Sequence, residues 1–222
     1  MLILKRREGR DGRAAGKTEG ETEPLDPDGA SALFGQVGYE AARIDAIAEA
    51  AEVSVGTFYN YFENKADLLL AIVSMEVEEV LHQGEAVVAA PPATAEAALF
   101  ALISTYYDHS LVYLTKEMWR TAMALSIQHP ETPFSRRYFA LDAALAEQVT
   151  ALLRGLQARG TIRRDADAAA LGEVIFADLN AMFTGFTMDE TMPLATLTGR
   201  MAAHVAALTG LLAPPLRPLP AG

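Results

Sequence analysis

The chain has 222 residues, of which 51% are hydrophobic, and it carries a net charge of −11. Its length suits one large helical domain or a small domain joined to a larger one, and the lack of cysteine excludes disulfides, thiolate metal ligands and thiol catalysis. The apolar start Met-Leu-Ile-Leu is too short for a signal peptide, and no stretch approaches an uncharged membrane span, so we expect a soluble cytoplasmic protein.

The first residues, 1–24, are rich in Gly, Glu, Lys and Arg and lack apolar periodicity, so we predict a disordered tail. Its basic residues leave two interpretations open: a tail without function, or an arm that reaches DNA phosphates or the minor groove. Asp26 and Pro27 then predict the start of a helix, because Asp caps helices and Pro suits the first helical position. We expect Gly38 to end this helix.

Two short apolar-periodic segments follow, at 44–51 and 55–62, and a tight turn joins them. This is the layout of a helix-turn-helix, in which the second helix enters the DNA major groove. Ser54 precedes the second helix and is placed to cap it by accepting a backbone N–H. The pattern therefore predicts a DNA-binding domain over residues 25–73.

A helix in the major groove exposes its N-terminal residues to base edges. Asn60 can pair with the N6 and N7 atoms of adenine, and Val55 and the Thr57 methyl group can touch a thymine methyl group. Gly56 costs the helix about 1 kcal/mol relative to Ala, but it lets the backbone approach the groove closely. The residues expected to contact phosphates are Arg43, Tyr59, Tyr61 and Lys65.

The charge of the predicted DNA-binding domain is unusual. Residues 29–75 contain Arg43 and Lys65 as their only basic residues, against six acidic ones. Phosphate neutralisation supplies most non-specific DNA affinity and its dependence on salt. We therefore expect weak non-specific binding with a shallow salt dependence.

Long apolar-periodic segments make up the rest of the chain, and no alternation typical of strands is present. The pattern predicts an all-α protein of about nine helices, with a second domain over residues 74–213. The Pro-rich tail 214–222 cannot continue a helix. The helices expected in this second domain, including its junction with the first, span 66–89, 94–112, 114–128, 134–158, 166–187 and 191–212.

The last two predicted helices, 166–187 and 191–212, favour a homodimer. The first of them is apolar on more than one face, so it must be buried on both sides. The second interleaves apolar residues with Gly and Ala, which permit close helix approach. A two-fold, four-helix interface is the natural interpretation, and an ordinary monomer core is the alternative.

Aromatic and methionine side chains concentrate in residues 100–139 and 176–192. Such a set suits a pocket for a largely apolar small molecule, although core packing is the alternative for each residue. Asp178 lies on an apolar helical stripe and needs a partner, either a ligand group, a tyrosine or a basic residue. The candidate ligand-binding residues are Phe100, Tyr106, Tyr107, Trp119, Met123, Tyr138, Phe176, Asp178 and Phe183.

The characteristic positions of one bacterial family are occupied by Phe34, Gly38, Tyr39, Ile44, Ile47, Ala48, Ala51, Val53, Ser54, Thr57, Phe58, Tyr59, Tyr61, Phe62 and Lys65. Residues 30 to about 73 thereby resemble the DNA-binding module of the TetR-type repressors. The resemblance implies a three-helix DNA-binding domain and a C-terminal helical domain that binds a small ligand and dimerises. One departure is Glu52, which stands where the family usually has the glycine of the turn, and a left-handed residue there costs about 1 kcal/mol.

We therefore expect a ligand-released repressor that binds a palindromic operator as a homodimer. The alternative is a helical ligand-binding or protein-interaction module with weak or lost DNA binding, which the acidic module would suit. We expect no enzyme, because no nucleophile elbow, phosphate-binding glycine loop or metalloprotease motif occurs. We expect no metal, because the four histidines are scattered singly. We expect no cofactor, only an unknown and largely apolar small-molecule effector.

Overall fold

The computed structural model describes residues 27–214, and within this range all regular structure is helical, as the sequence predicts. The predicted tail 1–24, the cap at Asp26 and most of the Pro-rich tail lie outside the described residues. The nine helices of the described range are α1 (Pro27–Val37), α2 (Ile44–Ala50), α3 (Val55–Tyr61), α4 (Lys65–Ala89), α5 (Ala95–His109), α6 (Lys116–Gln128), α7 (Pro133–Ala158), α8 (Ala168–Met188) and α9 (Leu194–Leu211).

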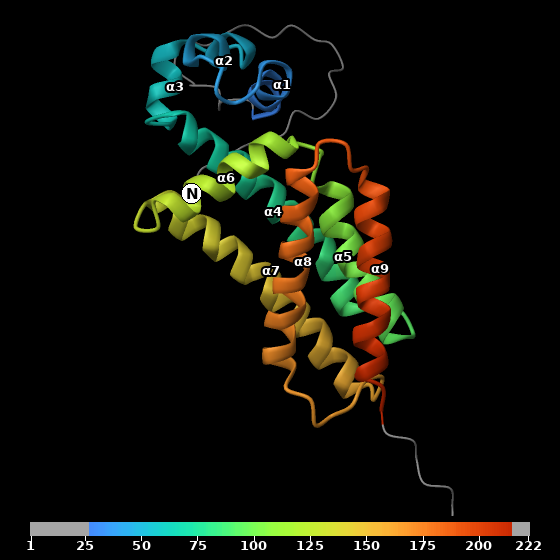
Figure 1. Ribbon diagram of the computed structural model, residues 1–222. Helices are drawn as coiled ribbons and strands as arrows, with labels where there is room; N and C mark the ends of the chain where they lie inside the picture. Colours follow the sequence, from blue (N-terminus) through green and yellow to red (C-terminus); the bar gives the residue numbers. More distant parts are fainter. Residues whose placement is uncertain (1–26, 215–222) are drawn as a thin grey trace, which may run out of the picture.

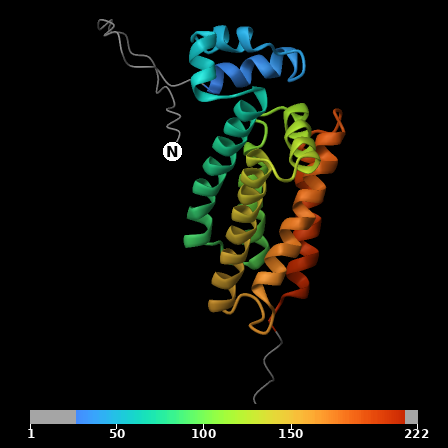
Figure 2. The same ribbon diagram turned by 90° about the vertical axis from the view of Figure 1, so that its left-hand side faces the viewer.

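Helices α1, α2 and α3 form a small module at one end of a long helical bundle (Figures 1 and 2). Helix α4 leaves this module and runs into the bundle, where it packs against α5 and α7. Helix α8 packs against α7, and α9 packs against α5. The turn between α8 and α9 lies at the end of the bundle that faces the small module (Figure 1).

Most helices begin at a side chain that caps them. The Oγ atom of Ser54 accepts a hydrogen bond from the Thr57 N–H at 3.0 Å, which confirms the predicted cap of α3. A cap satisfies N–H groups that have no partner within the helix. The other residues that cap helices in this way are Asn64, Thr94, Thr115, Thr132 and Asp167.

The turn between α2 and α3 uses a left-handed residue. Glu52 has a φ angle of 56°, and its N–H donates to the Glu49 carbonyl at 3.0 Å. The Val53 N–H then donates to the Ala48 carbonyl at 2.9 Å, which closes the turn. A residue with a Cβ atom is strained in this conformation, whereas glycine is not.

Replacing Glu52 should reveal this strain. We expect the Glu52→Gly variant to have a free energy of unfolding about 1 kcal/mol above that of Glu52→Ala, because both variants lose the side chain but only Ala keeps the Cβ clash. Chemical denaturation followed by circular dichroism measures both values. Equal stabilities of the two variants would show that the turn stores no strain.

Candidate DNA-reading surface and ligand cleft

The outer side of helix α3 presents both polar and apolar residues to solvent. Val55, Gly56, Tyr59 and Asn60 are exposed. On its inner side Phe58 is fully buried, and this anchors the helix to the module. Val55, Gly56 and Asn60, which the sequence predicts to read base edges, are thus accessible from solvent.

The core beneath this tip fixes the crossing of α2 and α3. It is built from side chains that the apolar spacing of the sequence selects. The fully or almost fully buried members are Ala30, Phe34, Ile47, Ala48, Phe58 and Phe62.

Arg43 stands beside this tip but is held by a neighbour. Its Nε and Nη2 atoms lie 3.1 Å from the two carboxylate oxygens of Asp45, in a fork-to-fork pair. This hydrogen bond lowers the pKa of Asp45. An arginine already paired with a carboxylate is a weaker phosphate ligand than a free one. The pair therefore leaves even less unpaired positive charge in the module for contact with phosphates.

Two other candidate phosphate contacts have structural roles as well. The Nζ atom of Lys65 donates to the carbonyls of Tyr39 and Glu40 at 2.9 and 3.1 Å, and it lies 4.9 Å from the centre of the Tyr39 ring. Lys65 thus ties the loop before α2 to the start of α4. Tyr61 is half-buried and packs against the core beside Phe62. Of the predicted phosphate contacts, Tyr59 and Arg43 are therefore the most accessible. Thr57, a predicted base contact, is half-buried.

The bundle contains a cleft between α4, α5, α6, α7 and α8. Its cavity volume is about 80 Å³, within about 590 Å³ of unfilled space that includes its opening to solvent. Its walls are mostly aromatic and aliphatic. The lining residues are Glu76, Val77, Val80, Tyr106, Tyr107, Ser110, Trp119, Tyr138, Asp142, Leu145, Phe176, Leu179, Asn180 and Phe183.

Six of the nine candidate ligand-binding residues line this cleft: Tyr106, Tyr107, Trp119, Tyr138, Phe176 and Phe183. The other three, Phe100, Met123 and Asp178, are not among its lining residues. Phe100 is exposed at the surface of α5. The carboxylate of Asp178 lies 2.8 Å from Nδ1 of His204 on α9, so its partner is a basic residue of the same chain.

The main polar group of the cleft was not predicted. Glu76 is only 1% exposed, and its Oε1 atom lies 2.9 Å from Nδ1 of His109. Its Oε2 atom is buried and has no hydrogen-bond partner. Burial raises the pKa of Glu76 to about 7, although the hydrogen bond with His109 opposes this shift.

The sequence did contain a sign of this residue. Glu76 stands within the apolar stripe of α4, just as Asp178 stands within that of α8. A carboxylate in such a stripe must find a partner or a ligand. The buried apolar neighbours of Glu76 along α4 are Leu69, Ile72, Val73, Val77 and Val80.

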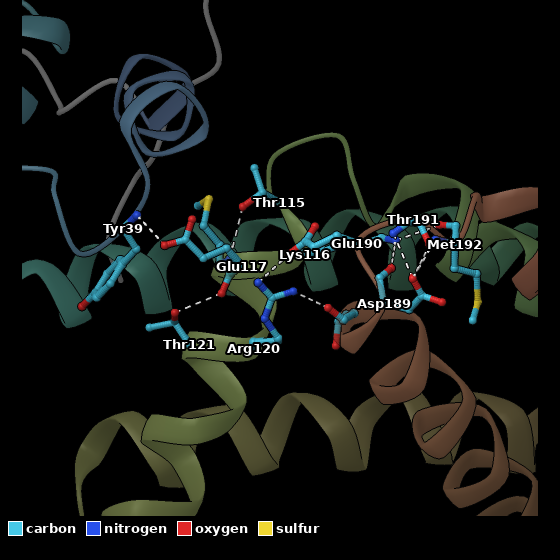
Figure 3. Close-up of polar contacts among 12 residues, drawn as sticks. Tyr39, Thr115, Lys116, Glu117, Arg120, Thr121, Asp189, Glu190, Thr191 and Met192 are labelled. Carbon is cyan, nitrogen blue, oxygen red and sulfur yellow. Dashed lines mark hydrogen bonds and ion pairs between the residues drawn. The ribbon is translucent and has the colours of Figure 1, made fainter.

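The first turn of α6 connects the small module to the turn between α8 and α9, which lies at the same end of the bundle (Figure 3). On one side, Oε1 of Glu117 accepts a hydrogen bond from the Tyr39 N–H at 3.1 Å. On the other, Nζ of Lys116 donates to the carbonyls of Asp189 and Met192 at 2.6 and 2.8 Å. The same helix carries Trp119 into the cleft. Helix α6 therefore touches the small module, the cleft and the turn between α8 and α9.

Comparison with known proteins agrees with this architecture. Residues 28–72 match the family model of the bacterial regulatory proteins of the tetR family. Over 58 residues the chain is 41% identical to the HTH-type transcriptional repressor KstR of Rhodococcus jostii, a match that covers 26% of this chain and only 27% of that protein. It is 26% identical over 169 residues to the fatty acid metabolism regulator protein of Bacillus subtilis, covering 73% of this chain and 82% of that protein.

A solved structure supports the whole fold. The crystal structure of the transcriptional regulator FadR from Bacillus subtilis, in complex with stearoyl-CoA, superposes with a TM-score of 0.61. The match covers 81% of this chain and 95% of that chain, at 21% identity. At this level of identity the likeness establishes a shared fold.

The match of residues 28–72 to the tetR-family model, on a three-helix module with an exposed third helix, supports a DNA-binding transcriptional regulator. Residues 28–72 carry the DNA-binding domain of the tetR family of bacterial regulatory proteins. This confirms the resemblance and the all-α fold predicted from the sequence, and it favours the regulator over a module without DNA binding. The relatives named above are regulators, in agreement with the expectation that the chain is not an enzyme.

The pairing of Arg43 with Asp45 gives a test of the DNA surface. We expect Asp45→Asn to raise DNA affinity several-fold and to steepen its salt dependence by about one phosphate contact, because Arg43 loses its competing carboxylate. Fluorescence anisotropy at several salt concentrations measures both quantities. The control, Glu49→Gln, changes the same charge at another exposed position of α2. An equal effect in both variants would attribute the change to net charge alone.

Proposed function

We propose that this protein is a ligand-released repressor that works in the cytoplasm and binds a palindromic operator as a homodimer. The observation that carries this proposal is the exposed tip of α3 within residues that match the tetR-family DNA-binding model. In this proposal Asn60, Val55, Gly56 and Thr57 read bases. Tyr59 and Arg43 contact phosphates and so position the module on the DNA, and Tyr61 and Lys65 make lesser phosphate contacts.

The surface of α8 and α9 supports the homodimer. Val174, Met188 and Leu211 are large apolar residues that are exposed in the single chain. Within the described residues, α8 is the helix whose length and hydropathy would suit a membrane span, yet only 22% of that apolar window is buried in its own chain. A soluble regulator needs a second copy to cover such a surface.

Glycines on the same surface leave room for close approach. A Cβ atom added at Gly185, Gly199 or Gly210 would meet no other atom within 4 Å. Two copies paired through α8 and α9 form the four-helix interface that the sequence predicts. For operator binding, the two α3 tips must then reach successive major grooves, about 34 Å apart.

The proposed switch uses the two helices that reach from the cleft to the DNA-binding module. Helix α4 begins in that module and lines the cleft with Val77 and Val80. Helix α6 lines the cleft with Trp119 and holds the module through Glu117. A ligand that favours a different spacing of α4 and α6 would change the separation of the two α3 tips. By linkage, such a ligand weakens DNA binding by the same factor by which DNA weakens ligand binding.

The chemistry of the walls supports a largely apolar effector. Because a structurally similar regulator has been crystallised with stearoyl-CoA, a fatty acyl compound is one ligand class to test in this cleft. The aromatic and aliphatic lining would accept its chain.

Footprinting on the DNA upstream of the gene tests the operator. We expect protection of an inverted repeat, and we expect Asn60→Ala to weaken binding to it about 10- to 100-fold through loss of one bidentate base contact. Affinity for unrelated DNA and the salt dependence should stay unchanged, because Asn60 carries no charge. Equal losses on operator and unrelated DNA would contradict the role of Asn60 in reading bases.

A charge placed in the proposed interface tests the dimer. We expect the unmodified protein to have twice the chain mass of 23.8 kDa in light scattering. Ala181→Arg on the exposed side of α8 should give single chains and at least a 100-fold weaker operator affinity. Ala143→Arg, at an exposed position of α7, is the matched control and should change neither property. A single-chain mass for the unmodified protein under all conditions would overturn the homodimer.

A further inference from the structure

The cleft contains acidic groups whose charges are not matched by its walls. Glu76 and Asp142 both line it, and the described residues that line it include no lysine or arginine. We propose that the effector has an apolar body and a protonated amine, and that the carboxylates of Glu76 and Asp142 bind its ammonium group. This inference rests on the proposed function, since it names the ligand class of the same cleft.

Glu76 supplies the first half of the argument. Its side chain is almost completely buried, and Oε1 faces His109 while Oε2 makes no hydrogen bond. Burial raises the pKa of this carboxylate and outweighs the lowering by His109 and by the Tyr113 backbone, which also interacts with it. Buried polar atoms are nearly always paired in native proteins, so an unpaired carboxylate oxygen beside a cleft calls for a donor from a ligand. An ammonium group offers three N–H donors and the opposite charge.

His109 does not neutralise the cluster. Its Nδ1 atom faces Glu76, and its Nε2 atom lies 3.2 Å from Oε2 of Glu79. One imidazole is therefore shared between two carboxylates. Even with a full positive charge on this ring, Glu76, Glu79 and Asp142 would leave the region negative.

Asp142 supplies the second half. It projects into the same cleft from α7, whereas Glu76 comes from α4. Burial raises the pKa of Asp142 to about 6, and no described residue donates a hydrogen bond to its carboxylate. Two carboxylates on different walls of one cleft attract a cation and repel an anion.

The aromatic walls point the same way. The hydroxyl groups of Tyr106 and Tyr107 donate to Gln148 Oε1 at 2.7 Å and to the Leu179 carbonyl at 2.9 Å. The indole N–H of Trp119 donates to the Ser110 carbonyl at 2.7 Å.

These three donors are already used, whereas the Tyr138 hydroxyl and the Asn180 amide, which also line the cleft, make no hydrogen bond with the described residues and can bind a polar group of a ligand. The aromatic rings themselves attract cations through their faces. An ammonium group can therefore lie against the faces of these rings.

Binding of three probes with one carbon skeleton tests the charge preference. Trp119 is the single tryptophan of the chain and lines the cleft, so its fluorescence reports occupancy directly. The probes are 4-phenylbutylamine, 4-phenylbutanol and 4-phenylbutyrate at pH 8. We expect the amine to bind at least 10-fold more tightly than the alcohol and the butyrate to bind most weakly.

Isosteric variants of the carboxylates locate the site. We expect Glu76→Gln and Asp142→Asn each to weaken amine binding at least five-fold while leaving the affinity for the alcohol within two-fold. Glu79→Gln is the control, because it removes a carboxylate from the same cluster but not from the lining. If one of the two variants fails to fold, the other carries the test.

Several outcomes would overturn the ammonium site: equal affinities of the three probes, tighter binding of the butyrate or of stearoyl-CoA, or an equal loss in the Glu79→Gln control. Operator release is measured in parallel and separates this inference from the proposed function. If stearoyl-CoA but not the amine releases the operator, the proposed repressor function is supported and the ammonium site is contradicted. If the amine binds tightly without any effect on DNA binding, the ammonium site is supported and the proposed ligand-released repression is contradicted.

Discussion

The burial of one face of α4 is the constraint on which the rest of this structure depends. Leu68 and Leu69 are fully buried near its start, beside the DNA-binding module, and Val77 and Val80 are buried further along, within the bundle. The buried residues of both parts form one continuous cluster. Because close-packed interiors transmit displacement rather than absorb it, the proposed switch acts through α4, from the middle of the helix to the helix-turn-helix.

Glu76 interrupts that apolar face where the cleft adjoins it. A fully apolar residue there would pack without any desolvation cost, whereas a buried carboxylate with an unpaired oxygen is costly to the fold. Local conflicts of this kind concentrate at functional sites, where stability is sacrificed for binding. The position of Glu76 on the helix that joins the two parts places a ligand-sensitive group directly on the proposed path of coupling.

Prediction from sequence succeeded where local pattern decides structure. Apolar periodicity gave the helices, and the hydroxyl of Ser54 at the start of α3 gave its cap, because both depend on neighbours within a few residues. It was weaker for side chains with long-range partners. The Lys65 ammonium group binds the carbonyls of Tyr39 and Glu40, and Asp178 pairs with His204, 26 residues away.

By itself, then, the sequence determined the all-helical class, the helix-turn-helix and the aromatic supply for a cleft, since spacing along a helix selects which residues share a face. Only the tertiary structure decided which aromatics meet: Tyr107 and Trp119 enter the cleft while Phe100 faces solvent. It also brought Glu76 of α4 and Asp142 of α7 into the lining of one cleft. The physical reason is that helix packing fixes the rotation of each helix about its axis, and no local pattern specifies that rotation.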